Sequence, residues 1–420
     1  MIKGVREISS ILLLTLLSYS GGIFLCQAQH KKVDDYIQKA LTNSPLLKDF
    51  KNQLLSDKTD SAILRAGYRP QVTASSTGSY APVINGYGYD NALSNGKTFD
   101  ALITANQNII GKSRRDIQLE GIILHSDSIN AASEISRQDI KKSITEQYIT
   151  TYTDQQQRDF YLEVYQLLQK EEKVLKVLAQ KSVYKQADYL AFLVTLQQQE
   201  LQLSQTSIQL KNDFARLNYL SGIIDTSVTV LQEPVLTATQ LTGLSNSIFI
   251  KGYKIDSLKL LNDKKQIDLN YKPQASVYIN GGYNSSFILQ PYKNFGTSVG
   301  FSVSVPVYDG GQRKMKHTQL QIQENTRQDY LQFFTRQYQQ QVNQLVQQLQ
   351  GTQELQAKIT RQIKFTEGLI NVDSKLLQTG DITIADYVIA INNYLNTQYM
   401  LRQVNISRLQ LINQLNYWNN

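Results

Sequence analysis

Two kinds of hydrophobic pattern alternate along the chain. Residues 122–221 contain neither glycine nor proline, and apolar residues recur there at spacings of three, four and seven, as at Ile140, Ile144 and Tyr148. Such spacing is typical of helices that bury one narrow apolar stripe. Residues 313–379 contain no proline and continue the same pattern. At 1.5 Å per residue, this second stretch predicts a helix about 100 Å long.

Shorter segments alternate apolar and polar residues with a period of two. Along residues 295–308, every second residue is apolar or threonine, and the others are glycine, serine, proline or tyrosine. Residues 99–109 alternate in a similar way. This period predicts strands with one apolar and one polar face. Two β-hairpins are therefore expected, at about 70–110 and about 273–308, with Val303 and Val305 on the apolar face of the second.

Three short motifs recur in the same order about two hundred residues apart. The motif pairs are Tyr68-Arg69-Pro70-Gln71 with Tyr271-Lys272-Pro273-Gln274, Ala187-Asp188-Tyr189 with Ala385-Asp386-Tyr387, and Leu217-Asn218-Tyr219 with Leu415-Asn416-Tyr417. Collinear matches at one offset indicate a duplicated unit. We expect two structural repeats, 29–230 and 231–420. Each contains a helix, a hairpin, a long helix, a tip turn and a final helix, with the tips at 181–188 and 379–386.

The N-terminus has the features of an export signal. Lys3 and Arg6 precede an apolar stretch, and Cys26-Gln27-Ala28 offers a cleavage site after Ala28, which predicts a signal peptide at 1–28. Lipidation of Cys26 remains the weaker alternative, because the bulky Leu25 precedes it. Cys26 is the only cysteine, so we expect neither a disulfide nor a thiolate metal site in the mature chain.

Composition argues against several classes of function. The net charge of +8 is spread along helical stretches, without the basic and aromatic clusters that nucleic-acid binding requires. The histidines, His30, His125 and His317, lie far apart, so we expect no metal site and no cofactor. No nucleophile and base stand at a spacing typical of catalysis. The sequence therefore predicts that the protein is not an enzyme.

The strands have the length of membrane-spanning strands. About 9 to 11 residues cross a bilayer as part of a tilted barrel wall. Two hairpins supply four strands, and four strands cannot close a barrel, whose smallest useful form has about eight. Open edges are not tolerated in hydrocarbon, so transmembrane strands would require several copies of the chain. Three copies would give twelve strands, and the long helices would extend from them.

The chain resembles the TolC family of outer-membrane efflux proteins over nearly all of its mature length. The matching segments are 40–45 (ALTNSP), 66–70 (AGYRP), 303–311 (VSVPVYDGG) and 380–387 (GDITIADY). The resemblance implies an α+β membrane protein, a homotrimer with a 12-stranded β-barrel in the lipid of the outer membrane of a Gram-negative bacterium, and a long α-helical barrel extending into the periplasm. It also implies a passive exit duct for efflux or type I secretion that docks to a periplasmic adaptor protein and an inner-membrane pump.

The resemblance directs attention to the two tips and to one strand–helix junction. The expected adaptor-docking residues are Tyr184, Lys185, Gln186, Thr379, Gly380 and Asp381. The first tip lacks a counterpart of Gly380, which predicts a different shape there. Asp373 is a possible gate, because threefold symmetry would make it a ring of three carboxylates; an ordinary surface charge is the alternative. Asp188 and Asp386 are interpreted as turn residues, and Gly310 and Gly311 as the bend from strand into helix.

A second class of function remains open at this stage. A periplasmic coiled-coil adaptor or scaffold would also contain long helical hairpins, although it would not need two hairpins of membrane-spanning length. The residues do not indicate the cargo or the class of pump.

Overall fold

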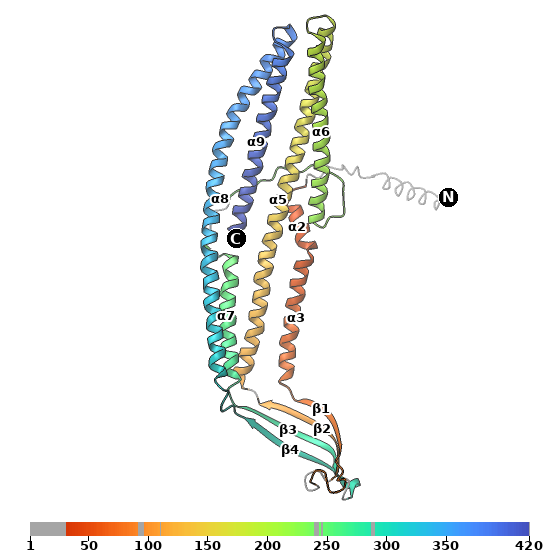
Figure 1. Ribbon diagram of the computed structural model, residues 1–420, viewed down its shortest axis with the longest axis vertical. Helices are drawn as coiled ribbons and strands as arrows, with labels where there is room; N and C mark the ends of the chain where they lie inside the picture. The colour runs from red at the N-terminus through yellow and green to blue at the C-terminus, as the bar shows by residue number, and fades with distance from the viewer. Residues whose placement is uncertain are drawn as a thin grey trace, which may run out of the picture. The chain divides into compact units, whose positions relative to one another are not determined.

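The computed structural model describes residues 31–90, 96–109, 111–238, 243–244, 247–286 and 290–419. The predicted signal peptide at 1–28, with Cys26, lies outside these residues. The elements follow in the order α2 (Val33–Asn43), α3 (Pro45–Gly67), β1 (Gln71–Tyr80), β2 (Lys97–Ile109), α5 (Lys112–Gln180), α6 (Gln186–Leu220), α7 (Ile248–Leu269), β3 (Gln274–Ser285), η2 (Pro291–Lys293), β4 (Phe295–Ser304), α8 (Gln312–Thr379) and α9 (Ile384–Trp418). Figure 1 shows them in sequence colours. Among the described helices, none combines the length and the apolar character that a membrane crossing requires.

The chain forms two compact units, and each is assembled from separate segments. The tip unit comprises the chain up to Ala40, Ile144–Val235 and Ile359–Ile406. The sheet unit comprises Leu41–Ser143, Leu236–Lys358 and Ser407–Asn420. Helices α5 and α8 contribute residues to both units, and each unit is described separately below.

Five helical segments form the tip unit, namely most of α2, the second part of α5, α6, the last part of α8 and most of α9. Its core is a narrow seam of fully buried side chains, among them Leu168, Leu175, Phe192 and Tyr387. Of the apolar positions predicted on α5, Ile144 and Tyr148 are buried, at 2% and 0% exposure, and Ile140 is half-buried. The remaining faces of these helices are rich in glutamine but not wholly polar, because Leu190, Val194 and Leu201 on α6 are more than half exposed in the single chain.

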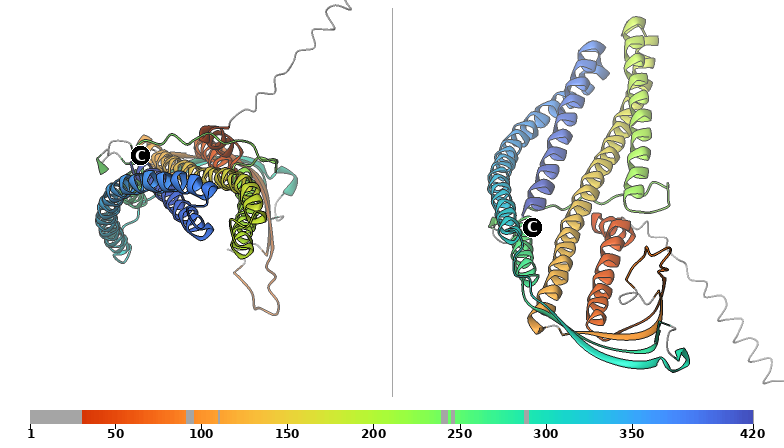
Figure 2. Two further views of the ribbon diagram at one scale, coloured as in Figure 1. Left: turned by 90° about the horizontal axis from the view of Figure 1, so that it is seen from above. Right: turned by 60° about the horizontal axis from the view of Figure 1, so that its bottom comes forward.

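The helices of the sheet unit pack around a cluster of aromatic side chains. Tyr338 and Leu345 on α8 pack with Leu415 on α9, and Trp418 joins this cluster. Phe249 on α7 lies 5.2 Å from Trp418 between ring centroids, in the range of favourable aromatic contacts. At one end of this unit the four strands lie side by side in one curved layer, which Figure 2 shows from below.

Several boundaries differ from the sequence-based expectation, and both tips are shorter than predicted because α6 and α9 begin at Gln186 and Ile384. The predicted first helix is divided into α2 and α3, because Ser44 caps a new helix through its side chain and Pro45 occupies the first turn. Strand β4 ends at Ser304 and does not continue to 308. Ser304 pairs with Gln274, the first residue of β3, and the preceding Pro273 has no N–H to extend the pairing. Val305 therefore lies outside the strand.

Candidate functional site

The four strands form one antiparallel sheet in the order β1-β2-β3-β4. Opposite residues include Ala74 with Ile103 in the first pair, and Ile279 with Val299 in the last. Ala105 pairs with Ile279, which connects the two hairpins in register. Directly opposed residues point to the same side of a sheet, so this register extends one face across all four strands.

The register places mostly apolar residues on one face of the sheet and mostly small or polar residues on the other. One face carries Val72, Ala74, Phe99, Ile103, Ile109, Val277, Ile279, Tyr283, Phe295, Val299, Phe301 and Val303. The opposite face consists mainly of serine, threonine, asparagine and glycine, with Leu102 and Tyr278 as the large exceptions. On the apolar face, Val299 is 80% exposed and Phe301 is 78% exposed in the single chain. A contiguous apolar surface of this kind marks contact with a membrane or another protein.

The two outer strands of the sheet carry no protection against further pairing. Neither β1 nor β4 contains a charged residue or a proline, and each has ten residues. Water-exposed edges are normally blunted by lysine, proline or bulges. Because the strand number is even, β4 of one copy would meet β1 of the next in antiparallel orientation. The edges are therefore suited to pairing between copies.

The junction of β4 with α8 contains the two predicted glycines. Gly310 and Gly311 have φ angles of 66° and 81°, a left-handed conformation that glycine adopts without steric cost. Asp309 accepts hydrogen bonds from the backbone N–H groups of Gly311 and Arg313, at 2.8 and 2.7 Å. These bonds satisfy free N–H groups at the start of α8, and the bond from Arg313 is the main cause that lowers the pKa of Asp309.

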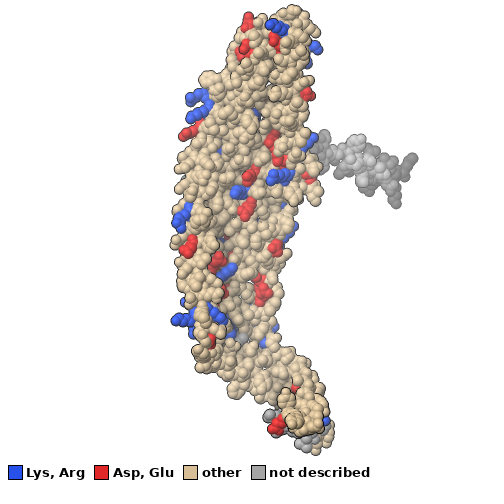
Figure 3. Space-filling view, in the orientation of Figure 1, with Lys and Arg blue, Asp and Glu red and all other residues tan. Residues whose placement is uncertain are grey.

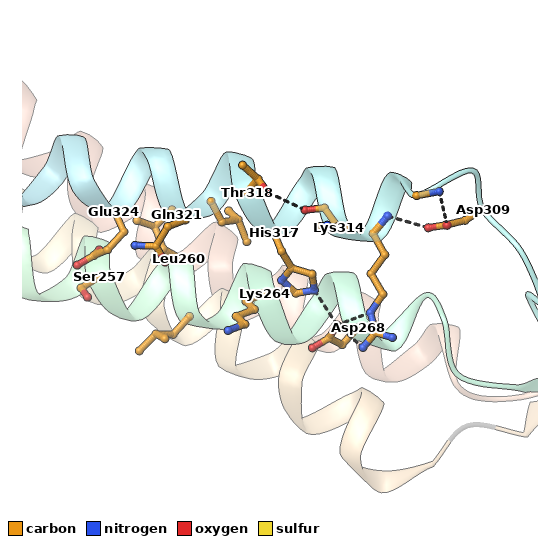
Figure 4. A pocket seen from close by; sticks show the side chains of 14 residues that line it. Ser257, Leu260, Lys264, Asp268, Asp309, Lys314, His317, Thr318, Gln321 and Glu324 are labelled. Atoms are coloured by element: carbon orange, nitrogen blue, oxygen red, sulfur yellow. Dashed lines mark hydrogen bonds and ion pairs between the residues drawn. The ribbon is translucent and has the colours of Figure 1, made fainter.

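A groove between α7 and α8 lies next to this junction, and Figure 4 shows its lining residues. Asp268 accepts hydrogen bonds from Arg313 and His317, at 2.8 and 2.9 Å. Partial burial favours protonated Asp268, but the bonds from Arg313 and His317 outweigh it and lower the pKa of Asp268. The groove therefore contains an ion network centred on Asp268, in which His317 Nδ1 is buried and has no hydrogen-bond partner among the described residues. Among the described residues, no group of three or more His, Cys, Asp or Glu is placed to hold a metal ion.

The two tip turns of the tip unit share one backbone geometry, and Ser182 takes the place of a glycine. Gly380 has φ 82°, and its neighbour Asp381 donates its N–H to the carbonyl of Leu376, five residues earlier. In the first turn, Ser182 has φ 61°, and Val183 donates to Leu178 in the same way. Both are Schellman-type helix ends with one left-handed residue. The different shape expected for the first tip is therefore wrong at the level of the backbone.

Tyr184 joins the two tips. It is only 9% exposed, and its hydroxyl oxygen lies 2.7 Å from the carbonyl oxygen of Leu377 and 3.1 Å from that of Ile382. Burial is the main cause that raises the pKa of Tyr184. Beside it, a Cβ added to Gly380 would lie 3.2 Å from Val183 Cγ1, so the turns are in close contact. Tyr184 therefore holds one turn against the other, and its side chain is not displayed for docking in the single chain.

The other predicted tip residues lie on the surface. Lys185, Gln186, Thr379, Gly380 and Asp381 are all exposed. The Thr379 hydroxyl donates to Asp381 at 2.5 Å, within one turn. These positions remain predicted docking residues, presented on the rigid pair of turns.

Asp386 has the role expected of a turn residue. Its carboxylate accepts from the Thr383 hydroxyl at 2.6 Å, and its own N–H donates to that hydroxyl at 3.1 Å. The backbone N–H of Thr383 in turn donates to the Asp386 carboxylate at 3.4 Å, and this exchange of backbone donors is a capping box at the start of α9. Asp188 lies in the first turn of α6, where a carboxylate is favoured by the helix dipole.

Asp373 lies near a buried carboxylate that the sequence did not indicate. Asp373 is half-buried, and the adjacent Ser374 donates to Glu171 at 3.0 Å. Glu171 is 7% exposed, and next to this site burial raises the pKa of Tyr387 to about 12. Glu171 precedes Ser374 by 203 residues, so no local pattern could associate them. The role of Asp373 as a gate remains a prediction.

A second pair of acidic residues lies deeper in the tip unit. Burial, with the neighbouring carboxyl group of Asp213, raises the pKa of Asp154 to about 8. Asp213 is 9% exposed and accepts a hydrogen bond from Gln147 at 3.2 Å. Two carboxyl groups at close range favour one shared proton, because both cannot be ionised without strong repulsion. This pair joins the consecutive helices α5 and α6 through residues 59 positions apart, and it was missed by sequence analysis.

Comparison with known proteins supports the fold strongly. No protein-family model and no curated protein matches the chain. Among solved structures, CusC, described as forming a transmembrane channel, is similar with a TM-score of 0.76 and 12% identity, over 93% of this chain and 93% of that chain. The outer-membrane protein VceC of Vibrio cholerae is similar with a TM-score of 0.73 and 14% identity, over 92% and 96%. The MtrE outer-membrane channel of Neisseria gonorrhoeae is similar with a TM-score of 0.71 and 11% identity, over 92% of this chain and 88% of that chain. The part of the expected fold that concerns a single copy, long helices with one four-stranded antiparallel sheet, is thereby confirmed.

Proposed function

We propose that this chain is the outer-membrane channel of a tripartite efflux or type I secretion system, in which it acts as a passive exit duct. The observation that carries the proposal is the sheet, with one exposed apolar face, one small and polar face, and two uncharged edges. The likeness to solved outer-membrane channels supports the same function.

The dimensions of the strands agree with a membrane wall. Ten residues at about 3.4 Å each give a strand about 34 Å long, and a tilt of about 45° reduces this to about 24 Å in depth. The apolar band of transmembrane barrels is about 25 Å tall. The apolar face would meet lipid, and the serine- and glycine-rich face would line an aqueous lumen.

Closure requires further copies of the chain. In the proposed homotrimer, β4 of each copy pairs with β1 of the next to complete a 12-stranded β-barrel, which leaves no edge in hydrocarbon. The long helices of three copies would form an α-helical barrel in the periplasm. The two tip turns, held together by Tyr184, would be its mouth, where a periplasmic adaptor docks and links the duct to an inner-membrane pump.

The test is isolation of the chain from outer-membrane fractions, followed by mass measurement in mild detergent and conductance in planar bilayers. We expect a trimer that conducts ions. A monodisperse monomer that conducts would exclude the shared barrel, and recovery from the soluble periplasm would favour the alternative, a coiled-coil adaptor or scaffold.

Docking at the tips has a separate test. Gly380→Leu places a large side chain against Val183 and forces a left-handed conformation on a residue with a Cβ, so we expect lost adaptor binding with a normal yield of trimer. Ser182→Gly is the matched control, because it preserves the turn geometry and should leave docking intact. Loss of trimer together with docking would assign Gly380 a purely structural role. Unchanged docking would exclude this tip as the contact.

A further inference from the structure

The positive charge of this protein is concentrated where the strands meet the helices. The register places the start of β1, the end of β2, the start of β3 and the end of β4 at one end of the sheet. The flanking segments 65–71, 111–116, 268–273 and 305–316 contain nine Lys or Arg and three Asp, a net charge of +6 out of +8 for the whole chain. Figure 3 shows Lys and Arg at the strand-side end of α8.

The cations at the starts of α5 and α8 occupy positions that a helix N-terminus disfavours. The first turns of α5 and α8 contain no acidic residue and instead carry Lys112, Arg115 and Lys314, among others. A helix N-terminus bears about half a positive charge, so acidic side chains are favoured there and cations are not. At the start of α5 the helix N–H groups and these cations together attract an anion from outside the protein, whereas Asp309 already caps the start of α8.

The sheet unit itself neutralises only part of this charge. Arg114 donates to the carbonyl of Leu269 at 2.6 Å, and Arg313 is paired with Asp268. By contrast, six exposed cations form no ion pair with any carboxylate within the described part of the chain, and we name them the basic belt. The basic belt comprises Arg65, Arg69, Lys112, Lys272, Lys314 and Lys316.

An exposed aromatic residue lies beside the basic belt. Tyr308, in the link from β4 to α8, is 90% exposed. Tyrosine is enriched at the level of lipid headgroups, where its ring is partly apolar and its hydroxyl meets water. The opposite end of the sheet has no comparable charge, since segments 81–98 and 285–294 contain only Asp90, Lys97 and Lys293 as charged residues.

We propose that the basic belt binds the phosphate groups of anionic phospholipids in the leaflet on the helical side of the sheet. This inference rests on the proposed membrane location of the sheet. Clustered lysines next to an apolar membrane-spanning surface recognise anionic headgroups, with each lysine contributing about a fivefold factor in affinity. The N-terminus of α5 adds to the same attraction. The belt would fix the depth of the barrel and enrich anionic lipid around it.

The experiment measures which lipid lies next to the belt. Tyr308→Trp in a Trp418→Phe background supplies one fluorescent reporter, because Trp418 is the only native tryptophan. The trimer is reconstituted into vesicles of equal parts phosphatidylglycerol and phosphatidylcholine, in which either one lipid or the other is brominated. Bromine quenches an adjacent tryptophan, so the two samples compare the two lipids at constant composition.

We expect quenching to indicate at least about a fivefold preference for phosphatidylglycerol, decreasing in 0.5 M salt as charges are screened. Replacing Lys112, Lys272, Lys314 and Lys316 together by Gln should reduce the preference to within about twofold of unity. The matched control replaces four exposed lysines of the tip unit by Gln and should retain it. These control positions are Lys170, Lys173, Lys176 and Lys211.

The possible outcomes separate this inference from the function on which it rests. Equal quenching by both lipids would contradict the binding of anionic phospholipids by the basic belt, and so would a preference that the four lysine substitutions leave unchanged. Either result would still be compatible with a sheet that lies in the membrane. Absence of quenching by either lipid would place the junction outside the bilayer and overturn the inference and the proposed location together. The unmodified chain gives a second readout, the ratio of the two lipids retained after detergent extraction, measured by mass spectrometry.

Discussion

Replacing Val299 by Arg tests the assignment of the sheet faces most directly. Val299 is the fifth of the ten residues of β4, lies opposite Ile279 on the apolar face, and is 80% exposed in the single chain. In the proposed barrel its side chain meets lipid close to the middle of the bilayer. Arginine at that depth costs about 2–4 kcal/mol per copy, or about 6–12 kcal/mol for a trimer with three substitutions.

The structure also predicts how this cost changes with depth. Val303 lies four residues nearer the end of β4, which is about 13 Å along the strand and about 9 Å in depth at a tilt of 45°. Val303→Arg should therefore cost only about 0–1 kcal/mol per copy, because an arginine near the interface reaches the headgroups. We therefore expect Val299→Arg to lower the free energy of unfolding much more than Val303→Arg does.

Ser298→Arg is the control at matched depth on the other face. It removes the hydrogen bond from the Ser298 hydroxyl to Asn280, 2.7 Å long, and should cost about 1 kcal/mol. The assay is guanidinium unfolding of each variant in lipid vesicles, compared by midpoint at constant slope. If Ser298→Arg is the more damaging change, the faces are inverted. If neither substitution shifts the unfolding midpoint, the sheet does not lie in a bilayer.

Three further predictions concern the tip unit. Tyr184→Phe should lower its stability by about 1–3 kcal/mol, because the carbonyls of Leu377 and Ile382 lose their buried donor, and faster proteolysis at the turns would report the loss. Ser182→Gly should raise the thermal midpoint by relieving about 1 kcal/mol of left-handed strain; an unchanged midpoint would contradict that strain. Asp154 has a folded pKa of about 8, well above its ordinary value, so its protonated form stabilises the fold and stability falls as pH rises from about 4 to about 8. Asp154→Asn should remove this dependence and gain about 1–3 kcal/mol at pH 8.5 after allowance for partial exposure, which denaturant titrations at pH 5 and 8.5 would test.

The sequence alone determined the elements and their faces. Apolar spacing along a helix and alternation along a strand are local properties, so the long helices and the apolar side of 295–304 follow from the order of residues. The recurrence of Ala187-Asp188-Tyr189 as Ala385-Asp386-Tyr387 likewise placed two equivalent turns. Even the cap formed by Asp386 was indicated by its position after a turn.

The tertiary structure decided which distant residues meet, because local spacing carries no information about contacts between helices. Tyr184 appeared in the sequence as a surface residue of a turn, but the second turn, almost two hundred residues later, buries it. Ser182 adopts the conformation of a glycine because the helix end and its packing impose it, against the local preference of serine. The pairs Asp154 with Asp213 and Glu171 with Ser374 exist only after the helices have packed. Strand β4 ends at Ser304 because its neighbour β3 begins after Pro273, and a strand extends only as far as its partner can supply hydrogen bonds.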